Sequence, residues 1–330
     1  MKRRIGRSER GAALLAVLLL VAVMGALAVA MLEKLKLSVA LAGNNAALDQ
    51  SRAFAIGIES LLALRIDDIV ALSPNLTTSA GGWNGEVRTI PLPGGGLAQA
   101  VVRDGGNCFN VNSVADGSVA AELTPRALGV EQFVNLMRVL EIPEQAARGI
   151  AASAGDWVDA DSDLSRGGAE DSAYQGGTPS YRPGNTYFAD VSELRAVSGV
   201  TPEIYAALRP WLCALPSTDL SPINVNTLNP AQAPLVAMLA PDLISLGAAE
   251  AVIAARPAAG WSDITEFYRT PPLRPMVLPL DVQSQPQLRT KWFTLDLKIG
   301  LQGAELHETA LVDARISPAR VVARRWGGDD

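Results

Sequence analysis

The sequence is poor in the residues on which most enzyme active sites depend. It has one histidine, His307, and two cysteines, Cys108 and Cys213, in 330 residues. Zinc sites and serine-hydrolase triads rely on imidazole side chains, so neither chemistry is expected. It also lacks a P-loop and the glycine fingerprint of dinucleotide-binding folds. The sequence therefore argues against an enzyme, including an exported hydrolase with an acidic site, and we interpret His307 as an ordinary solvent-facing residue.

Lysine is scarce as well. After Lys36 only Lys291 and Lys298 occur, and the whole chain carries a formal net charge of −6. Proteins that bind nucleic acids neutralise phosphates with clustered Lys and Arg side chains. The charge therefore argues against nucleic acid as a partner.

The N-terminus combines basic residues with a long apolar run. Lys2, Arg3, Arg4, Arg7 and Arg10 precede an uncharged stretch over residues 12–32. As a helix this stretch is roughly 31 Å long at about 1.5 Å per residue, enough to cross a bilayer. The basic flank stays on the cytoplasmic side by the positive-inside rule. We expect a single-pass inner-membrane protein of a Gram-negative bacterium, with its C-terminal domain in the periplasm.

Three kinds of N-terminal segment fit this pattern: a secretory signal, a plain membrane anchor, and a segment cut before its apolar helix. Secretory signals have apolar regions of about 7–15 residues, shorter than this one, although Ala28-Val29-Ala30 mimics a cleavage site. Apolar residues continue at helical spacing over 32–66, and no proline interrupts them. The membrane segment and the following soluble segment therefore read as one long helix.

The junction "SERGAALLAV" (8–17) resembles that of type IV pilins and type II secretion pseudopilins. The resemblance implies cleavage by prepilin peptidase between Gly11 and Ala12, with methylation of the new N-terminus. Such subunits usually carry Glu at the fifth mature position, thought to neutralise the terminal ammonium of the subunit ahead. Here that position is Ala16, which suits a subunit with nothing ahead of it, at the tip of a filament. The alternative interpretation of Ala16 is a simple membrane anchor.

Strand patterns flank a helical middle region. Residues 97–112 read as a hairpin that turns at Asp104-Gly105-Gly106, after a short strand near 86–90. Downstream, Phe293, Leu295, Leu297 and Ile299 alternate with polar residues, and 319–326 reads as a further strand. The expected fold class is α+β: a long N-terminal membrane-spanning helix packed on a pilin-like antiparallel sheet, with a large inserted all-α domain. The expected segments are a basic leader (1–11), the pilin helix (12–72, transmembrane over 12–32), the first part of the sheet (73–113), the inserted helical domain (114–284) and the C-terminal part of the sheet (285–330).

Two stretches of the insert, 191–212 and 223–268, resemble helix-hairpin-helix units. The first has a turn at Ser198-Gly199-Val200, and Thr201 can cap the next helix. In DNA-binding versions, backbone amides and nearby cations hold phosphates. Residues 114–279 contain 19 acidic residues against 10 Arg and no lysine, a net charge of −9. We expect a structural use of the motif, with a membrane-anchored DNA-binding protein as the alternative function.

Several motifs together resemble the protein K (GspK) family of minor pseudopilins in type II secretion systems. They are the Gly11 junction with Ala16, "CFNVN" (108–112), "DWVDADSD" (156–163), "GGAED" (167–171), "FADVSELRAVSGV" (188–200) and "INVNTLNP" (223–230). The resemblance implies a non-catalytic subunit in a tip complex with the I-type and J-type minor pseudopilins, in contact with an inner-membrane assembly platform. Such a subunit would start pseudopilus assembly or limit its length.

An acidic loop in the insert predicts a cation site. Residues 159–170 place acids at positions one, three, five and twelve, as in an EF-hand, but the sixth position is Leu164 rather than glycine. An actual EF-hand is therefore not expected. Relatives in the resembled family are understood to bind calcium in the insert, and five carboxylates in 13 residues repel one another unless neutralised. We predict a Ca²⁺ site of another geometry, with the candidates Asp159, Asp161, Asp163, Glu170 and Asp171.

The two cysteines, Cys108 and Cys213, lie on either side of the first helical half of the insert. In an exported domain two cysteines favour a disulfide, which here would tie the insert to the sheet. Two buried free thiols are the alternative.

Overall fold

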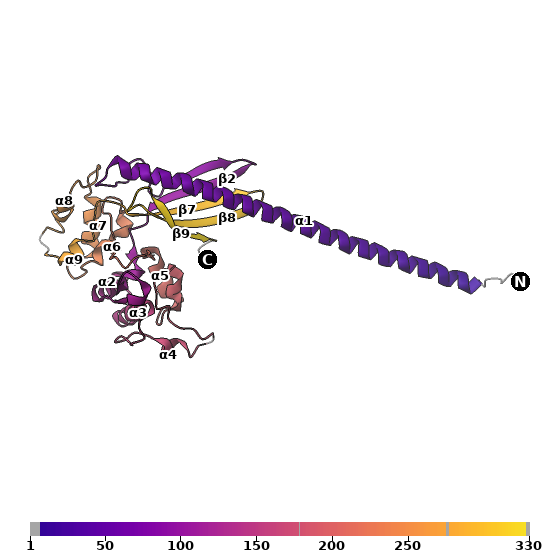
Figure 1. The fold of residues 1–330 in the computed structure, drawn as a ribbon, viewed down its shortest axis with the longest axis horizontal. Helices are drawn as coiled ribbons and strands as arrows, with labels where there is room; N and C mark the ends of the chain where they lie inside the picture. The colour runs from indigo at the N-terminus through magenta and orange to yellow at the C-terminus, as the bar shows by residue number, and fades with distance from the viewer. Residues whose placement is uncertain (1–6, 178, 275–276, 328–330) are drawn as a thin grey trace.

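The computed structural model describes residues 7–177, 179–274 and 277–327. A single helix, α1 (Arg7–Leu72), projects far beyond a globular head that contains a sheet and a helical insert (Figure 1). Most of the expected leader, residues 1–6, lies outside the described residues. Among the described helices, α1 alone is long and apolar enough to cross a membrane.

The two halves of α1 have different surroundings. Residues 11–46 are exposed on all sides, and from Ala47 onward one face becomes buried. The exposed part is about 54 Å long at about 1.5 Å per residue, which exceeds a bilayer's hydrocarbon core. Its leucines, valines and alanines need an apolar environment that the head does not supply.

The sheet has five antiparallel strands in the order β1-β2-β7-β8-β9. Their bounds are β1 (Val87–Leu92), β2 (Gly96–Asp104), β7 (Trp292–Leu301), β8 (Ala304–Asp313) and β9 (Arg320–Trp326). The predicted alternation in β7 is confirmed: Phe293, Leu295, Leu297 and Ile299 are all buried. The strand expected at 319–326 is confirmed as β9.

The C-terminal half of α1 covers one face of this sheet. Ala55 and Ile58 share a hydrophobic cluster with Leu297, Ile299 and Leu306 from β7 and β8. About two turns further along, Ile66 belongs to a second cluster with residues of the same two strands. Burial of this helix face fixes α1 on the sheet.

The predicted hairpin over 97–112 is wrong. β2 pairs with β1, so the hairpin runs over 87–104 and turns at Pro93-Gly94-Gly95. Gly94 and Gly95 adopt φ of 83° and 86°, a conformation that glycine reaches without strain. Gly105 and Gly106 do not return the chain to the sheet. Instead, the chain enters the insert at these two glycines. The N–H of Gly105 donates a hydrogen bond to Trp292 O at the start of β7.

The insert runs between β2 and β7, neighbours in the sheet. Its α-helices are α2 (Ala127–Val139), α3 (Glu144–Val158), α4 (Asp171–Tyr174), α5 (Pro202–Leu208), α6 (Ala233–Ala237), α7 (Leu246–Ala254), α8 (Ile264–Tyr268) and α9 (Leu280–Gln283). It is not all-α. It also has two short strand pairs, β3 (Phe109–Asn110) with β6 (Leu212–Cys213), and β4 (Ala115–Asp116) with β5 (Thr124–Pro125).

The helix-hairpin-helix units are not established by the structure. Residues 191–196 form a 3-10 helix, so the stretch 191–212 lacks the first α-helix that the helix-hairpin-helix motif requires. The chain then turns at Gly199, with φ of 85°, and Thr201 Oγ1 accepts a hydrogen bond from Ile204 N at the start of α5. The cap expected at Thr201 is therefore confirmed, while the hairpin motif around it is not.

The insert repeats one hydrogen-bonding pattern instead. The Asn112 amide donates to Phe188 O at 3.0 Å and accepts from Phe188 N at 2.7 Å. The Asn226 amide bonds Trp261 in the same way, at 3.0 and 2.8 Å. Asn112 and Asn226 are each the last residue of an Asn-Val-Asn triplet. The insert therefore contains two units with the same internal hydrogen bonds. The first unit begins near the triplet at 110–112, and the second begins near the triplet at 224–226.

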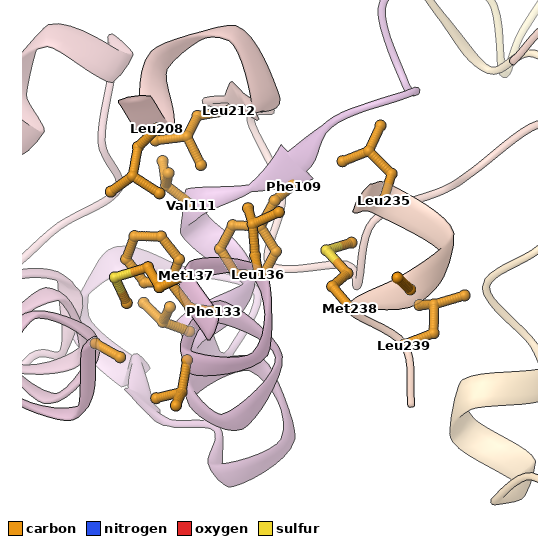
Figure 2. Packing of buried hydrophobic residues seen from close by; sticks show 14 of the residues in the cluster. Phe109, Val111, Phe133, Leu136, Met137, Leu208, Leu212, Leu235, Met238 and Leu239 are labelled. Atoms are coloured by element: carbon orange, nitrogen blue, oxygen red, sulfur yellow. The ribbon is translucent and has the colours of Figure 1, made fainter. Parts of the chain in front are cut away.

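The two units share one hydrophobic core, which runs from Phe109 to Val282. The rings of Phe109 and Phe133 stack with centroids 4.9 Å apart, and Leu235 and Met238 of the second unit approach the same core (Figure 2). Because the core spans both units, we expect the insert to fold as one body.

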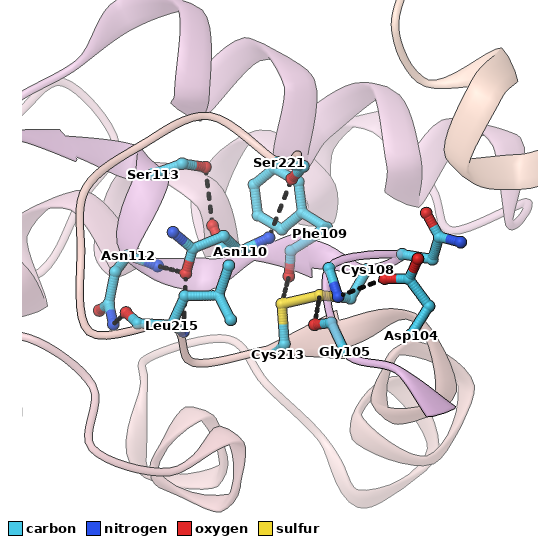
Figure 3. Close-up of a disulfide and its surroundings, with 12 residues drawn as sticks. Asp104, Gly105, Cys108, Phe109, Asn110, Asn112, Ser113, Cys213, Leu215 and Ser221 are labelled. Carbon is cyan, nitrogen blue, oxygen red and sulfur yellow. Dashed lines mark hydrogen bonds between the residues drawn. A yellow bond between two sulfur atoms is a disulfide. The ribbon is translucent and has the colours of Figure 1, made fainter. Parts of the chain in front are cut away.

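A disulfide joins Cys108 to Cys213, with the two Cα atoms 5.7 Å apart (Figure 3). Beside it the Asn110 side chain is fully buried. Its amide nitrogen donates to Ser217 O and Asp219 O, and its oxygen accepts from Leu215 N. Covalent and polar contacts therefore anchor β3 to β6. The expected disulfide is present, but both cysteines lie in the insert, so the expectation that it ties the insert to the sheet is wrong.

Candidate metal centre and relationship to known proteins

Three acidic side chains converge where α3 ends. Asp156 lies in the last turn of α3, Asp159 follows that helix directly, and Glu170 precedes α4. Each offers one carboxylate oxygen within a group whose members all lie within 4.8 Å of one another. The loop over 160–169 closes this group by returning the chain from Asp159 to Glu170.

All three carboxylates are removed from solvent. Asp156, Asp159 and Glu170 are 0, 1 and 5% exposed. Within the described residues, Asp156 Oδ1 and both oxygens of Asp159 and of Glu170 are buried without a hydrogen-bond partner. Burying an unpaired carboxylate is costly unless the group is protonated or binds a cation.

The same crowding raises the pKa values. Burial raises the pKa of Asp159 to about 7, and repulsion from Asp161, Asp156 and Glu170 adds to the effect. Burial and the charge of Asp156 also raise the pKa of Glu170. The cluster therefore takes up protons when no cation neutralises it.

The donor set fits a hard divalent cation. Carboxylate oxygens are the ligands that calcium and magnesium prefer, and zinc sites usually include nitrogen or sulfur. No histidine belongs to this group. The residues present would hold Ca²⁺ through Asp156, Asp159 and Glu170.

The structure brings together two of the five acidic residues chosen from the sequence, Asp159 and Glu170. Asp161 and Asp163 are exposed, and the Asp161 carboxylate instead accepts the backbone N–H of Asp163 at 2.7 Å. Asp171 is the first residue of α4, where its carboxylate lies 3.5 Å from Arg182 Nε. These three do not belong to the buried group.

Sequence reasoning missed Asp156. Its signal was the spacing of three residues from Asp159, which places both at the end of one helix. Gly168 supplies a second overlooked feature, because a Cβ atom there would lie 2.1 Å from Asp156 Oδ2. A larger residue at this position would have to displace the Asp156 carboxylate from its place in the cluster.

An aromatic group borders the cluster. Trp157 follows Asp156 in the chain, and its ring lies 5.5 Å from that of Tyr174 and 6.1 Å from that of Phe188, centroid to centroid. Burial raises the pKa of the Tyr174 phenol, and the charges of Asp156 and Glu170 add to this shift, which places this ring near the cluster.

The residues of the expected processing junction lie within α1. Gly11, Ala12 and Ala16 are helical and exposed, and no side chain of the head approaches Gly11. The helix begins upstream at Arg7, so the expected cleavage point lies within α1, where its uncharged stretch starts.

Two segments match a protein family described as "Type II secretion system (T2SS), protein K", residues 107–217 and 223–286. Each segment begins shortly before one of the two Asn-Val-Asn triplets, so the family match follows the two units of the insert.

Curated proteins named type II secretion system protein K are similar over most of the chain. The protein from Klebsiella pneumoniae is 32% identical over 324 residues, 97% of each chain. The protein from Aeromonas hydrophila is 36% identical over 262 residues, 78% of each chain.

A solved structure shares the fold. It is a chain from the crystal structure of the GspK-GspI-GspJ complex of the enterotoxigenic Escherichia coli type 2 secretion system. The two align with a TM-score of 0.73 at 28% identity, over 85% of this chain and 97% of that one. Sequence and fold agree, and the chain belongs to the type II secretion system protein K family of minor pseudopilins.

Proposed function

We propose that the protein acts, without catalysis, at the tip of the type II secretion pseudopilus, where it starts assembly or limits filament length during export across the outer membrane. The observation that carries this proposal is the exposed apolar half of α1 with Ala16 at its fifth mature position. A helix of this kind needs a membrane or neighbouring helices around it.

The proposed location is the inner membrane, with one span and the head in the periplasm. The basic leader stays cytoplasmic and is removed by prepilin peptidase between Gly11 and Ala12, after which the new terminus is methylated. Cleavage there leaves the whole exposed part of α1 on the mature protein.

Ala16 supports the tip position. A charged terminal ammonium inside the membrane costs several kcal/mol unless a carboxylate pairs with it. A subunit without that carboxylate cannot neutralise a subunit ahead of it, so it fits at the end of the row.

The size of the insert supports the same position. The insert extends from one end of the sheet, to the side of α1 (Figure 1). A head of this breadth is difficult to repeat along a thin filament, whereas a single terminal copy meets no neighbour above it.

The proposed partners are I-type and J-type minor pseudopilins, because a related chain occurs in a complex with GspI and GspJ. The exposed face of α1 would pack against their parallel helices. The inner-membrane assembly platform is the further partner that insertion requires.

The deciding experiment is the mass of the mature protein from membranes with and without prepilin peptidase. We expect a chain that begins at Ala12 and carries a methyl group, only when the peptidase is present. A chain beginning near residue 31 would identify a secretory signal, and an uncut chain a plain anchor. Either result would contradict the proposal.

We also propose that Asp156, Asp159 and Glu170 bind Ca²⁺ and that the ion fixes the loop over 160–169. Trp157 follows Asp156 in the chain, so Tb³⁺ bound to the cluster should show luminescence sensitised by its indole, and Ca²⁺ should compete it away. Asp156→Asn should abolish the signal. Undiminished luminescence in that variant would locate the ion elsewhere.

A further inference from the structure

A second group of buried charges lies where α1 meets the sheet. Glu59 of α1 and Glu308 of β8 are 4 and 1% exposed, and Arg324 of β9 reaches between them. One helix and two neighbouring strands thus contribute one charged side chain each.

The guanidinium is shared unequally. Arg324 Nε donates to Glu59 Oε2 at 2.7 Å, and its Nη2 donates to Glu59 Oε1 at 2.5 Å. The same Nε lies 3.3 Å from Glu308 Oε1, but within the described chain neither oxygen of Glu308 accepts a hydrogen bond. Glu59 is therefore fully paired, and Glu308 is left with a neighbouring carboxylate.

No other charge on the surrounding strands compensates Glu308 in the described structure. The β7 residue opposite it is Leu297, and Asp296 and Lys298 on either side point to the other face because side chains alternate along a strand. His307 points away for the same reason. Asp67 of α1 lies about two turns from Glu59, and its carboxylate accepts a hydrogen bond from Ala319 N.

The pKa values follow from this arrangement. Burial raises the pKa of Glu308 to about 7, and the hydrogen bond and the negative charge of Glu59 add to it. Burial opposes ionisation of Glu59 as well, but hydrogen bonds from Arg324 and Glu308 lower its pKa below the ordinary value.

We propose that Glu59 and Glu308 hold one shared proton in the folded protein, and that this buried proton-binding site fastens α1 to the sheet. The proton lets Glu308 donate a hydrogen bond to Glu59 while Arg324 holds Glu59 from the other side. Its release leaves two buried carboxylates facing one guanidinium, and α1 then detaches more readily.

The direction of the pH dependence follows by linkage. A carboxyl whose pKa is higher in the folded protein stabilises it at low pH, and that stability is lost as pH rises from its unfolded pKa to its folded one. The equilibrium constant for local detachment of α1 should therefore rise about tenfold per pH unit up to roughly pH 7 and level off above it.

Hydrogen exchange on the full chain in detergent micelles tests the proposal. With saturating Ca²⁺ and rates corrected for intrinsic pH dependence, amides of residues 55–66 should lose protection between about pH 5 and pH 7. Glu308→Gln should keep that protection constant. Glu305→Gln changes an exposed carboxylate of the same strand and should behave as the wild type.

An unchanged pH response in Glu308→Gln, or no response in the wild type, would overturn the proposal. If Glu308→Gln does not fold, Glu59→Gln serves instead, because it leaves Arg324 free to pair with Glu308 and should also remove the response. With saturating Ca²⁺, the infrared band of a protonated carboxyl that is lost in the wild type as pH rises through about 7, and that is absent in Glu308→Gln, is an independent readout.

Discussion

At the residue scale, the decisive feature is that carboxylates are buried in groups. Asp156, Asp159 and Glu170 lie close together in the insert, and Glu59 and Glu308 meet beneath α1. Each group carries more negative charge than its neighbours neutralise. The first has no guanidinium among its ligand atoms and suits a metal ion, whereas the second already contains Arg324 and suits a proton.

Replacement of Asp159 should have opposite effects with and without calcium. Asp159→Asn removes repulsion, so we expect a higher melting temperature than wild type in chelator at pH 8. It also removes a ligand, so added Ca²⁺ should no longer raise the melting temperature. Asp161→Asn, at an exposed position in the same loop, should retain the calcium response. A calcium response that survives in Asp159→Asn but not in Asp161→Asn would exclude the buried cluster as the site.

The metal-free protein should lose stability as pH rises toward 7. Burial holds the pKa of Asp159 at about 7, above its unfolded value, so its protonated form stabilises the fold at low pH and this contribution disappears as the pH rises. Melting curves in chelator between pH 5 and 8 measure the effect. Saturating Ca²⁺ should flatten the dependence, and an equal slope with and without the ion would contradict the assignment.

At the element scale, close approach between helices and strands limits which residues fit. Gly129 in α2 faces Ser113, and a Cβ atom there would lie 1.8 Å from Ser113 O. Gly149 in α3 has no such neighbour, since its nearest foreign atom would lie 3.9 Å away. The close packing of α2 on Ser113 therefore requires glycine at position 129, whereas the packing of α3 leaves room for a side chain at position 149.

Gly129→Ala should destabilise the protein by about 3 kcal/mol, because α2 must move away from the backbone it packs on. Gly149→Ala should be neutral or stabilise by up to about 1 kcal/mol, because alanine favours helices. Denaturant unfolding of the two variants measures the difference. Equal effects of both substitutions would show that the contact with Ser113 does not constrain α2.

Loss of the disulfide should weaken the insert. Cys108 and Cys213 are 105 residues apart, and in the chain-entropy model closing a loop of this length contributes up to about 4–5 kcal/mol. Unfolding of a Cys108→Ala/Cys213→Ala variant should therefore begin at lower denaturant concentration. The wild type with reductant should match it. Unchanged midpoints in both would mean that packing alone holds the first unit closed.

The elements also show what the sequence could and could not predict. Alternating burial in β7 and the single long helix follow from local periodicity, and both were predictable. The hairpin was misplaced because Asp104-Gly105-Gly106 has the composition of a turn, yet the chain there leaves the sheet. The spacing of Asp156 from Asp159 indicates only that both lie at the end of one helix. Asp156 was missed because its burial depends on contacts with the loop near Gly168, which this spacing does not encode.

At the scale of the whole molecule, membership in the protein K family accounts for both the anchor and the head. The alternative of a DNA-binding protein has no support, since the relatives are secretion proteins and residues 114–279 of the insert carry a net charge of −9. The exposed half of α1 belongs to a helix that is long and apolar enough to cross a membrane. The insert makes its head broader than the sheet alone.

Ala16→Glu should change how the protein enters the pseudopilus. A carboxylate at this position can pair with the terminal ammonium of a neighbour, so the variant should alter the incorporation of the protein or the length of the filament. Filament length and the number of copies per filament measure the effect. Ala16→Gln has a similar shape without charge and serves as the control. Unchanged length and copy number in Ala16→Glu would remove the argument from this position.

The placement of the insert between two neighbouring strands has a consequence for folding. β2 and β7 pair only after residues 105–291 have been made, so this contact has high contact order and closes slowly by diffusion alone. The insert shortens that search once folded, because Asp104 and Thr290 at its two ends are hydrogen-bonded together and Gly105 N binds Trp292 O. The sheet that supports α1 should therefore form last, on a template supplied by the insert.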